Sequence, residues 1–371
     1  MAGGKQHIPF ESFRLKEVQG RYLPPALLSA ILQKYLPPES ISSLGYSVQQ
    51  RHIYQVRLGS GPVRVYMWSQ MHGNESTPTK ALLDLMFYLQ SKPASDAGLL
   101  EKLQLCLIPM VNPDGAEAYT LVNANQVDLN RDAAERTQPE SVVLRKAFED
   151  FRPDFCFNLH DQRSIYGVGD TGVSATLSFL APSADLQRSI TPAREQAMRL
   201  IAGLAAGLEP EIPGGIGRYD DSFNASCVGD QFQRAGVPTL LVEAGHFPGD
   251  YARETTRRMV FAALLEALRL IARKSYQGYT LGQYHAIPEN RKNFADILIR
   301  QPGRLHKRYS GLQTLLLQYE ERLQNGKLLL LPSLPEDGLT EGAFGHAVYD
   351  ASRREDRERL MAHPALAKLF S

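Results

Sequence analysis

The sequence predicts an α/β fold in which a mixed or parallel sheet carries helices on both faces. Two observations lead to this prediction. Short apolar segments alternate along the chain with segments of helical period, and a polar cluster follows each of four apolar segments. The chain has 371 residues, of which 43% are apolar and 22% charged, an ordinary globular composition. This length is enough for one large domain and a smaller one.

The first predicted elements lie before residue 69. A short helix over residues 26–35 should end before the prolines that follow, because proline lacks a backbone donor and clashes with the preceding turn. Residues 53–58 and 63–68 are apolar or alternating and predict two strands. The Gly-Ser-Gly-Pro segment between them, residues 59–62, is typical of a turn, so the two strands are expected to form a hairpin.

Helices and strands alternate through the rest of the main domain. The segment 103–111 is nearly continuously apolar, as expected for a strand covered on both faces. The other predicted strands cover residues 155–159 and 239–242. The predicted helices cover residues 79–89, 141–151, 186–208, 229–235 and 253–273.

A change in composition near residue 285 divides the chain. We expect an N-terminal segment over residues 1–49, a main domain over residues 50–285 and a C-terminal extension over residues 286–371. The extension contains two leucine-rich stretches and a charged helix or tail at its end. Its role is left open.

Charge and cysteine content exclude several classes of protein. The 41 basic and 40 acidic residues give a formal net charge of +1 without blocks of one sign, so no nucleic-acid or membrane partner is expected. No segment resembles a signal peptide or reaches the ~20 apolar residues of a membrane span, which predicts a cytoplasmic protein. Cys106, Cys156 and Cys227 have no paired spacing and are expected to be reduced, buried thiols.

Polar clusters occur where four apolar segments end, and each cluster contains groups used in zinc hydrolysis. Binding sites of open α/β sheets form at the carboxyl ends of strands, where the loops converge. The clusters are His72-Gly73-Asn74-Glu75, Asn112-Pro113-Asp114-Gly115 with the later 127–132 segment, His160-Asp161, and Glu243-Ala244-Gly245-His246. Any one of them alone is weak, and their conjunction predicts a site.

A catalytic zinc ion typically has three protein ligands and one open position. Two histidines and a carboxylate supply that set here: His72, Glu75 and His160. Gly73 would let the chain turn tightly enough for the first two to reach one ion. Zinc lowers the pKa of its bound water towards ~7, and a separate carboxylate must take the proton. Glu243, at the end of an apolar strand, suits that role.

The order of these motifs resembles that of the zinc metallocarboxypeptidases of the carboxypeptidase A-like superfamily. The order is HxxE, NPDG, D-x-N-R, a strand-terminal histidine and a strand-terminal glutamate, and the resemblance covers roughly residues 50–275. It implies a mixed, mainly eight-stranded sheet and one zinc ion per chain. It also implies His72, Glu75 and His160 as ligands and Glu243 as the general base.

The resemblance also implies how substrate would be held. Asn130 and Arg131 match the pair that binds the terminal carboxylate, and a guanidinium group can bind a carboxylate through two hydrogen bonds. Asp128 matches an acid that orients the first ligand histidine. Tyr219 lies about where the family has a mobile tyrosine over the substrate, although a surface tyrosine is an equal alternative.

The sequence departs from the family at the oxyanion end of the site. The family usually has an arginine between NPDG and D-x-N-R, and residues 116–127 contain none. Arg163 or Arg218 are alternative sources of the missing charge. His246 is expected either to touch substrate or to cap a turn, and Asp161 to bind backbone.

The main functional hypothesis is a zinc metallocarboxypeptidase that hydrolyses a peptide or amide bond next to a free terminal carboxylate, with Glu243 activating a zinc-bound water. The alternatives are an N-acyl amino acid deacylase, a cell-wall peptide amidase, or a binding protein without turnover. The expected partner is a peptide or N-acyl amino acid with a free carboxylate. The oligomeric state is left open.

Overall fold

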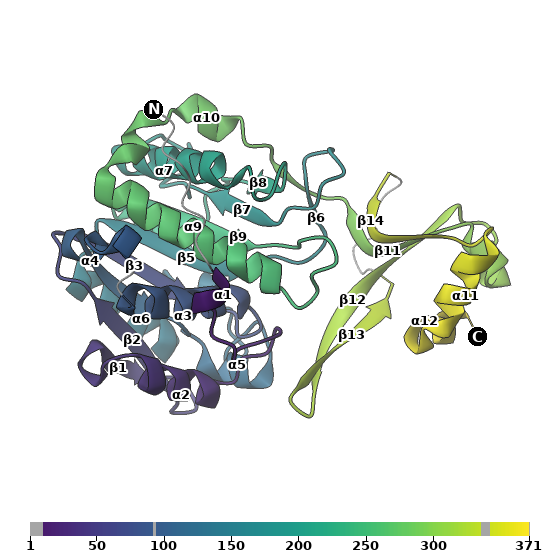
Figure 1. Cartoon of the computed structure of the whole chain (residues 1–371), viewed down its shortest axis with the longest axis horizontal. Coiled ribbons are helices and arrows are strands. Elements are labelled where there is room, and N and C mark those ends of the chain that lie inside the picture. The colour runs from purple at the N-terminus through teal and green to yellow at the C-terminus, as the bar shows by residue number, and fades with distance from the viewer. Residues whose placement is uncertain (1–9, 92–93, 335–341, 371) are drawn as a thin grey trace.

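The computed structural model describes residues 10–91, 94–334 and 342–370. At its centre is an eight-stranded mixed sheet with helices on both faces (Figure 1), which confirms the predicted fold class. The strand order is β1-β2-β4-β3-β5-β9-β7-β8. The strands are β1 (Ile41–Tyr46), β2 (His52–Leu58), β3 (Val63–Ser69), β4 (Leu103–Ile108), β5 (Phe155–Asp161), β7 (Leu177–Leu180), β8 (Ile216–Arg218) and β9 (Thr239–Ala244).

Two hydrophobic cores lie on the two faces of this sheet, because successive side chains of a strand point to opposite faces. Met67 and Phe157 belong to the larger core, and Tyr66 and Trp68 belong to the smaller one. The helices of the larger core are α1 (Phe10–Phe13), α2 (Pro25–Tyr35), α3 (Thr77–Gln90), α4 (Leu99–Lys102), α5 (Pro113–Ala118), α7 (Pro192–Leu208), α9 (Glu254–Arg273) and α10 (Leu281–His285). The smaller core is covered by α6 (Pro139–Phe151) and α8 (Val228–Arg234).

The predicted hairpin between β2 and β3 is wrong, although both strands are present. β4 lies between them, antiparallel to β2 and parallel to β3. The connection passes the start of β4, where Ser60 N donates to Leu100 O and Gly61 N donates to Leu103 O. A Cβ on Gly61 would lie 2.0 Å from the carbonyl carbon of Lys102. The glycine therefore permits the backbone to pass close to β4. From the sequence, a glycine needed for such close packing looks the same as a glycine needed for a hairpin turn.

The main sheet begins before the predicted boundary at residue 50. β1 pairs antiparallel with β2, and Ser42 lies opposite Gln55. β1 is a half-exposed edge strand, so it lacks the apolar pattern by which the other strands were predicted. The segment before it is tied to the helices by Asp84, which accepts from Leu15 N and forms an ion pair with Arg257 at 2.7 Å. The described part of the N-terminal segment, residues 10–49, therefore packs as part of the main domain.

The predicted helices are present, with some changed ends. α7 begins at Pro192, six residues later than predicted, because the Thr191 hydroxyl accepts from Arg194 N and so caps the helix there. Leu186, included in the predicted helix, lies outside α7 and is 77% exposed. Within the described residues, no helix has both the length and the apolar character to cross a membrane.

The C-terminal extension contains a small unit that we call the C-terminal module, described over residues 294–334 and 342–370. Its sheet has the order β13-β12-β11-β14, and it packs with two helices around its own core, which includes Ile299, Leu317 and Leu360. Figure 1 shows it beside the main domain. Its elements are β11 (Phe294–Arg300), β12 (Thr314–Gln324), β13 (Lys327–Ser333), β14 (Phe344–Asp350), α11 (Arg354–Ala362) and α12 (Pro364–Phe370). Just before it, β10 (Asn290–Lys292) pairs with β6 (Tyr166–Val168) of the main domain.

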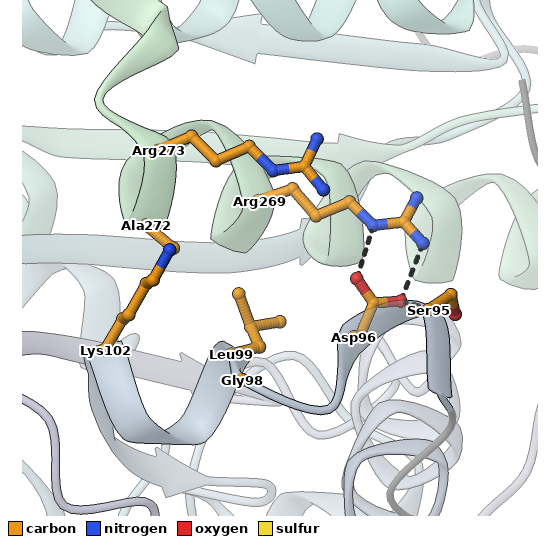
Figure 2. A pocket seen from close by; sticks show the side chains of 8 residues that line it. All are labelled: Ser95, Asp96, Gly98, Leu99, Lys102, Arg269, Ala272 and Arg273. Atoms are coloured by element: carbon orange, nitrogen blue, oxygen red, sulfur yellow. Dashed lines mark hydrogen bonds and ion pairs between the residues drawn. The ribbon is translucent and has the colours of Figure 1, made fainter. Parts of the chain in front are cut away.

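A cavity of about 150 Å³ lies between α4 and the end of α9. Figure 2 shows Arg269 on its wall, where the guanidinium group binds both carboxylate oxygens of Asp96 at 2.9 and 2.7 Å. Lys102 and Arg273 also face this cavity. Lys102 directly precedes β4, so the cavity lies at the amino end of that strand. None of the residues predicted to form the site lines it.

Candidate metal centre

Three adjacent parallel strands bring the predicted site residues together. β3 pairs with β5, and β5 pairs with β9, so their carboxyl ends share one edge of the sheet. The register places His160 opposite Glu243. His72 and Glu75 follow the end of β3 at the same edge. The sheet thus gathers side chains that lie up to 171 positions apart in the sequence, from His72 to Glu243.

The loop that carries His72 and Glu75 is fixed by local hydrogen bonds and by α5. Glu75 N donates to His72 O at 3.1 Å, and Gln70 Nε2 donates to Gly73 O at 2.8 Å. A Cβ on Gly73 would lie 1.9 Å from the carbonyl carbon of Gly115. Gly73 does not have a positive φ, so its backbone conformation does not require glycine. Glycine is needed here because the loop packs closely against α5, and the reason expected from the sequence, a tight turn, is wrong.

His72, Glu75 and His160 form one hydrogen-bonded cluster. Glu75 Oε1 lies 2.8 Å from His72 Nδ1, and Glu75 Oε2 lies 2.9 Å from His160 Nδ1. One potential ligand atom from each of the three lies within 4.8 Å of the others. Two imidazole nitrogens and a carboxylate oxygen are donors that zinc accepts at about 2.0–2.2 Å. The arrangement therefore fits a zinc ion held by His72, Glu75 and His160.

The electrostatics of the cluster favour a cation. Burial opposes charge on His72, but the Glu75 and Asp128 carboxylates outweigh it and raise the pKa of His72 to about 10. Burial lowers the pKa of His160. Burial also opposes the charge of Glu75, yet the two histidines hold the pKa of Glu75 below its ordinary value. The site thus has an ionised carboxylate and attracts positive charge.

Asp128 lies where the resemblance places it. Its Oδ1 atom is 3.0 Å from His72 Nε2 and also accepts from Asn130 N at 2.8 Å. Burial raises the pKa of Asp128, and the hydrogen bond from His72 reverses that shift, so the pKa is lowered overall. Because Nε2 faces Asp128, the other ring nitrogen of His72 is directed towards Glu75.

Glu243 lies next to the metal-ligand cluster. Its side chain is partly exposed and makes no hydrogen bond or ion pair with any described residue. Burial and the nearby Glu75 carboxylate raise the pKa of Glu243 well above its ordinary value. A carboxylate of raised pKa that is not bound by other groups is suited to accept and release a proton.

Asn130 and Arg131 lie beside the loop that leads into α8. Asn130 Oδ1 accepts from Val228 N at 3.2 Å. The exposed Arg131 donates through Nη1 to Cys227 Sγ at 3.0 Å. No carboxylate among the described residues pairs with Arg131, so its guanidinium group remains available for an anionic substrate group.

Tyr219 lies near the cluster as well. Its ring is 5.3 Å from that of Tyr166, and its backbone N donates to Phe179 O at 3.0 Å. Burial, followed by the charges of Glu243 and other neighbours, raises the pKa of the Tyr219 phenol. Tyr219 directly follows β8 and is partly buried, so it is not a fully exposed surface tyrosine.

The two arginines considered for the oxyanion end of the site differ in their contacts. Arg218 forms an ion pair with Glu289 at 2.7 Å and donates to Ile287 O, so it is already engaged. Arg163 follows β5 by two residues, is exposed, and has no ion pair among the described residues. Leu121, within the segment that lacks the arginine, is 42% exposed.

The side chains of His246 and Asp161 are not part of the metal-ligand cluster, although the backbone N of Asp161 donates to Glu75 Oε2 at 3.0 Å. His246 is 1% exposed, and neither ring nitrogen has a partner among the described residues. Its ring lies 4.7 Å from Tyr251 and 4.2 Å from His346 of the C-terminal module. Asp161 accepts from the Thr77 hydroxyl at 2.7 Å and so binds the start of α3.

Two charged residues outside the predicted set lie beside the site loops. Arg21, in the N-terminal segment, forms an ion pair of 2.5 Å with Glu321 on β12. The Tyr119 hydroxyl donates to the same carboxylate at 2.6 Å. No sequence pattern singled out Arg21 or Glu321, since neither belongs to a motif. The sequence feature closest to this contact is the segment 116–127, which includes Tyr119 and lacks the arginine usual in the family.

Comparisons with known proteins agree with this class of site. A model of the zinc carboxypeptidase family matches residues 26–162. Carboxypeptidase M of Mus musculus is 28% identical over 194 residues, 45% of this chain and 42% of that protein. Carboxypeptidase 2 of Trichophyton rubrum is 28% identical over 102 residues, 28% of this chain and 19% of that protein. The chain thus matches less than half the length of these relatives.

Two solved structures share the fold. A metallo-carboxypeptidase from Burkholderia cenocepacia has a TM-score of 0.54 at 19% identity and covers 69% of this chain and 70% of its own. One from Pseudomonas aeruginosa, in complex with (2-guanidinoethylmercapto)succinic acid, also has a TM-score of 0.54, at 20% identity, with coverages of 67% and 69%.

The fold is that of solved metallo-carboxypeptidases, and the donor set fits a metal ion. The predicted family resemblance is confirmed over the matched segment: residues 26–162 match the zinc carboxypeptidase model, and solved metallo-carboxypeptidases share the fold. The matched segment 26–162 contains His72, Glu75 and His160 but ends before Glu243. Geometry and not this match therefore places Glu243 in the site.

Proposed function

We propose that this protein is a zinc-dependent metallocarboxypeptidase that hydrolyses a peptide or amide bond next to a free terminal carboxylate. The observation that carries the proposal is the convergence of His72, Glu75 and His160 beside Glu243. His72, Glu75 and His160 would hold the ion. Bound zinc would polarise the scissile carbonyl and acidify water.

Glu243 supplies the acid–base chemistry in this proposal. Its carboxylate takes a proton from the attacking water as the new C–O bond forms. It then passes that proton to the leaving amine nitrogen as the C–N bond breaks, which leaves a carboxylic acid and a free amine. The raised pKa of Glu243 and its lack of hydrogen bonds to described residues support this role.

Arg131 and Asn130 would restrict cleavage to chain ends by binding the substrate's terminal carboxylate. An ion pair with hydrogen bonds between guanidinium and carboxylate is strong and directional. The free guanidinium of Arg131 supports this, since its contacts among the described residues are a thiol and a carbonyl. Tyr219, close to Glu243, would contact the bound substrate.

The proposed partner is a small peptide or N-acyl amino acid, and no nucleic acid or membrane is proposed. A cytoplasmic location remains a prediction, which fractionation of the native cell would test. No specific observation favours a deacylase or a binding protein over the peptidase. Residues 116–127 lack the arginine that the family usually has near the scissile carbonyl. The experiment therefore varies the acyl side of the substrate, that is, whether it is a peptide or an N-acyl group.

The test combines metal analysis with a matched substrate panel. Zinc content is measured on the purified chain, and hydrolysis is followed for blocked dipeptides, their C-terminal amides and N-acyl amino acids. We expect one zinc per chain and cleavage of free acids over amides. Preference for acyl amino acids over every dipeptide would change the function to a deacylase. A zinc-loaded protein inert to all three sets would overturn the proposal.

A further inference from the structure

The C-terminal module contacts loops that follow three strands of the main sheet. His346 Nε2 lies 2.7 Å from Ser164 O, in the loop after β5. Tyr251, in the loop after β9, donates to Asp296 Oδ1 at 2.9 Å. Glu321 reaches the N-terminal segment and α5, which adjoin the loop after β3. The module is thus attached to the edge of the sheet that carries the candidate metal centre.

Glu321 is the member of these contacts that links two chain segments at once. One oxygen binds Arg21 Nη1 at 2.5 Å, and the other accepts from the Tyr119 hydroxyl at 2.6 Å. The Arg21 side chain is 11% exposed and that of Glu321 is 25% exposed, so the pair is largely shielded from solvent. A shielded pair of this kind holds its geometry better than an exposed one.

The segments that contain Arg21 and Tyr119 are each hydrogen-bonded to a residue next to Glu75. The Arg21 carbonyl accepts from the Ser76 hydroxyl at 2.6 Å, and Ser76 follows Glu75. The carbonyl of Thr120, next to Tyr119, accepts from Asn74 N at 3.2 Å, and Asn74 precedes Glu75. One carboxylate of the C-terminal module is therefore connected to the residue on each side of a predicted zinc ligand, through the Ser76 hydroxyl and the Asn74 backbone N.

The alternation of β12 explains why Glu321, and not the adjacent Glu320, makes these contacts. Tyr319 and Glu321 point towards the main domain, where Tyr319 packs edge-on against Tyr251 at 5.1 Å. Glu320 and Arg322 point the other way and form an exposed ion pair of 2.9 Å, with side chains 52% and 59% exposed. The adjacent Glu320 is a matched control of the same charge without a link to the site.

We propose that Glu321 is a positioning residue for the metal centre: through Arg21 and Tyr119 it fixes the loop that presents His72 and Glu75. The inference deepens the proposed function, because it concerns the same site, and it makes the C-terminal module part of the hydrolytic unit. Glu321 does not touch the metal ligands itself. Its effect is on where Glu75 lies.

The experiment uses the full chain and three variants: Glu321→Gln, Tyr119→Phe and the control Glu320→Gln. Zinc affinity is measured by competition with a chromogenic chelator, and amide exchange is followed in the metal-free protein for the peptide containing residues 72–77. Tyr119→Phe keeps the ion pair and removes one hydrogen bond, so it should remain folded even if Glu321→Gln does not.

We expect Glu321→Gln to weaken zinc binding about tenfold, the lower end of the effect seen when outer partners of metal ligands are lost. Tyr119→Phe should show a smaller loss, and both should speed exchange in residues 72–77. With substrate, kcat should fall while KM stays within twofold. Glu320→Gln should match the wild type in each measurement.

The inference is overturned if Glu321→Gln and Tyr119→Phe both match Glu320→Gln in zinc affinity and in exchange. A drop in melting temperature alone, with unchanged zinc affinity, would make Glu321 a residue of general stability and would also overturn it. Zinc binding does not require any substrate to be cleaved. A failure of the proposed peptidase activity would therefore be distinguishable from a failure of the positioning role.

Discussion

The metal half of the candidate site and its substrate half are held in different ways. His72 and His160 are 9% and 2% exposed, and both bind the same carboxylate, Glu75. In the substrate half, Arg131 is exposed and its contacts are Asn130 O and a cysteine sulfur. The metal half is therefore an interlocked cluster, whereas the substrate half consists of more weakly restrained side chains on loops.

This difference separates two kinds of effect. Side chains at the ends of buried strands have positions fixed by the sheet, so their loss should remove metal or chemistry. Side chains on loops are restrained by few contacts and can adjust, so their loss should weaken substrate binding and leave the metal in place. Substitutions in the two halves should therefore produce distinct patterns, and five of them test the comparison.

The largest effect is expected for Glu243→Gln. The amide cannot accept a proton, so turnover should fall about 10²–10⁴-fold while zinc content stays at the wild-type level. Steady-state kinetics and elemental analysis of one preparation check this. Near-normal kcat in a zinc-loaded Glu243→Gln protein would remove Glu243 from the mechanism.

His160→Gln should break the metal half directly. A neutral amide is a poor zinc donor, and loss of one of three ligands is worth on the order of 3–4 kcal/mol, or about 10²–10³-fold in affinity. Chelator competition measures the change. His285→Gln, at a histidine outside the site, is the matched control and should bind zinc normally. Equal zinc affinity in the two variants would contradict the ligand set.

Arg131→Met should affect the substrate half alone. Loss of charge-assisted hydrogen bonds worth about 1.5–3 kcal/mol predicts a rise in KM of about 10–100-fold for a free carboxylate, with zinc content unchanged. Arg136→Met, an exposed arginine five residues away, is the control. A C-terminal amide substrate should be insensitive to Arg131→Met. If acid and amide lose the same activity, Arg131 does not bind the carboxylate.

Asp128→Asn tests the boundary between the halves, because Asp128 binds His72 and also starts the segment that carries Arg131. Loss of the negative charge next to His72 should weaken zinc binding about tenfold, at the low end for such partners. The chelator assay used for His160→Gln measures it. If Asp128→Asn instead raises KM at constant zinc affinity, Asp128 belongs to the substrate half.

The smallest effect is expected for Tyr219→Phe. One phenol hydrogen bond to substrate is worth about 0.5–1.5 kcal/mol, so kcat/KM should fall about 2–10-fold with unchanged zinc binding. Tyr166→Phe keeps the ring that packs against Tyr219 and removes the hydroxyl that interacts with the Tyr219 phenol, so it separates that interaction from substrate contact. Equal losses in the two variants would indicate that the Tyr219 hydroxyl acts through Tyr166 and does not contact substrate.

The metal half could be predicted from the sequence because each of its residues lies at the carboxyl end of an apolar strand or within six residues after it. Parallel strands share one carboxyl edge, so His72, His160 and Glu243 were expected at that edge, and the pairing of β3 with β5 and of β5 with β9 brings them together. The substrate half came only from the family resemblance. Arg131 and Tyr219 lie on loops, whose course no periodic pattern specifies.

Other features could not be predicted at all. The position of β4 between β2 and β3 depends on pairing over about 50 residues, and the local turn residues at 59–62 indicated a hairpin instead. The contact of Glu321 with Arg21 joins residues 300 positions apart in the sequence. No short-range pattern carries such information.

The sequence by itself determined the alternation of helices and strands, the two apolar faces of the sheet and the chemistry at the strand ends. These follow from side-chain periodicity and local backbone preferences, which act within a few residues. The tertiary structure decided the strand order, the reason for Gly73 and the attachment of the C-terminal module to the metal loop. These features depend on contacts between segments that are far apart in the sequence. The free energy of such contacts is determined by the packing of the whole core.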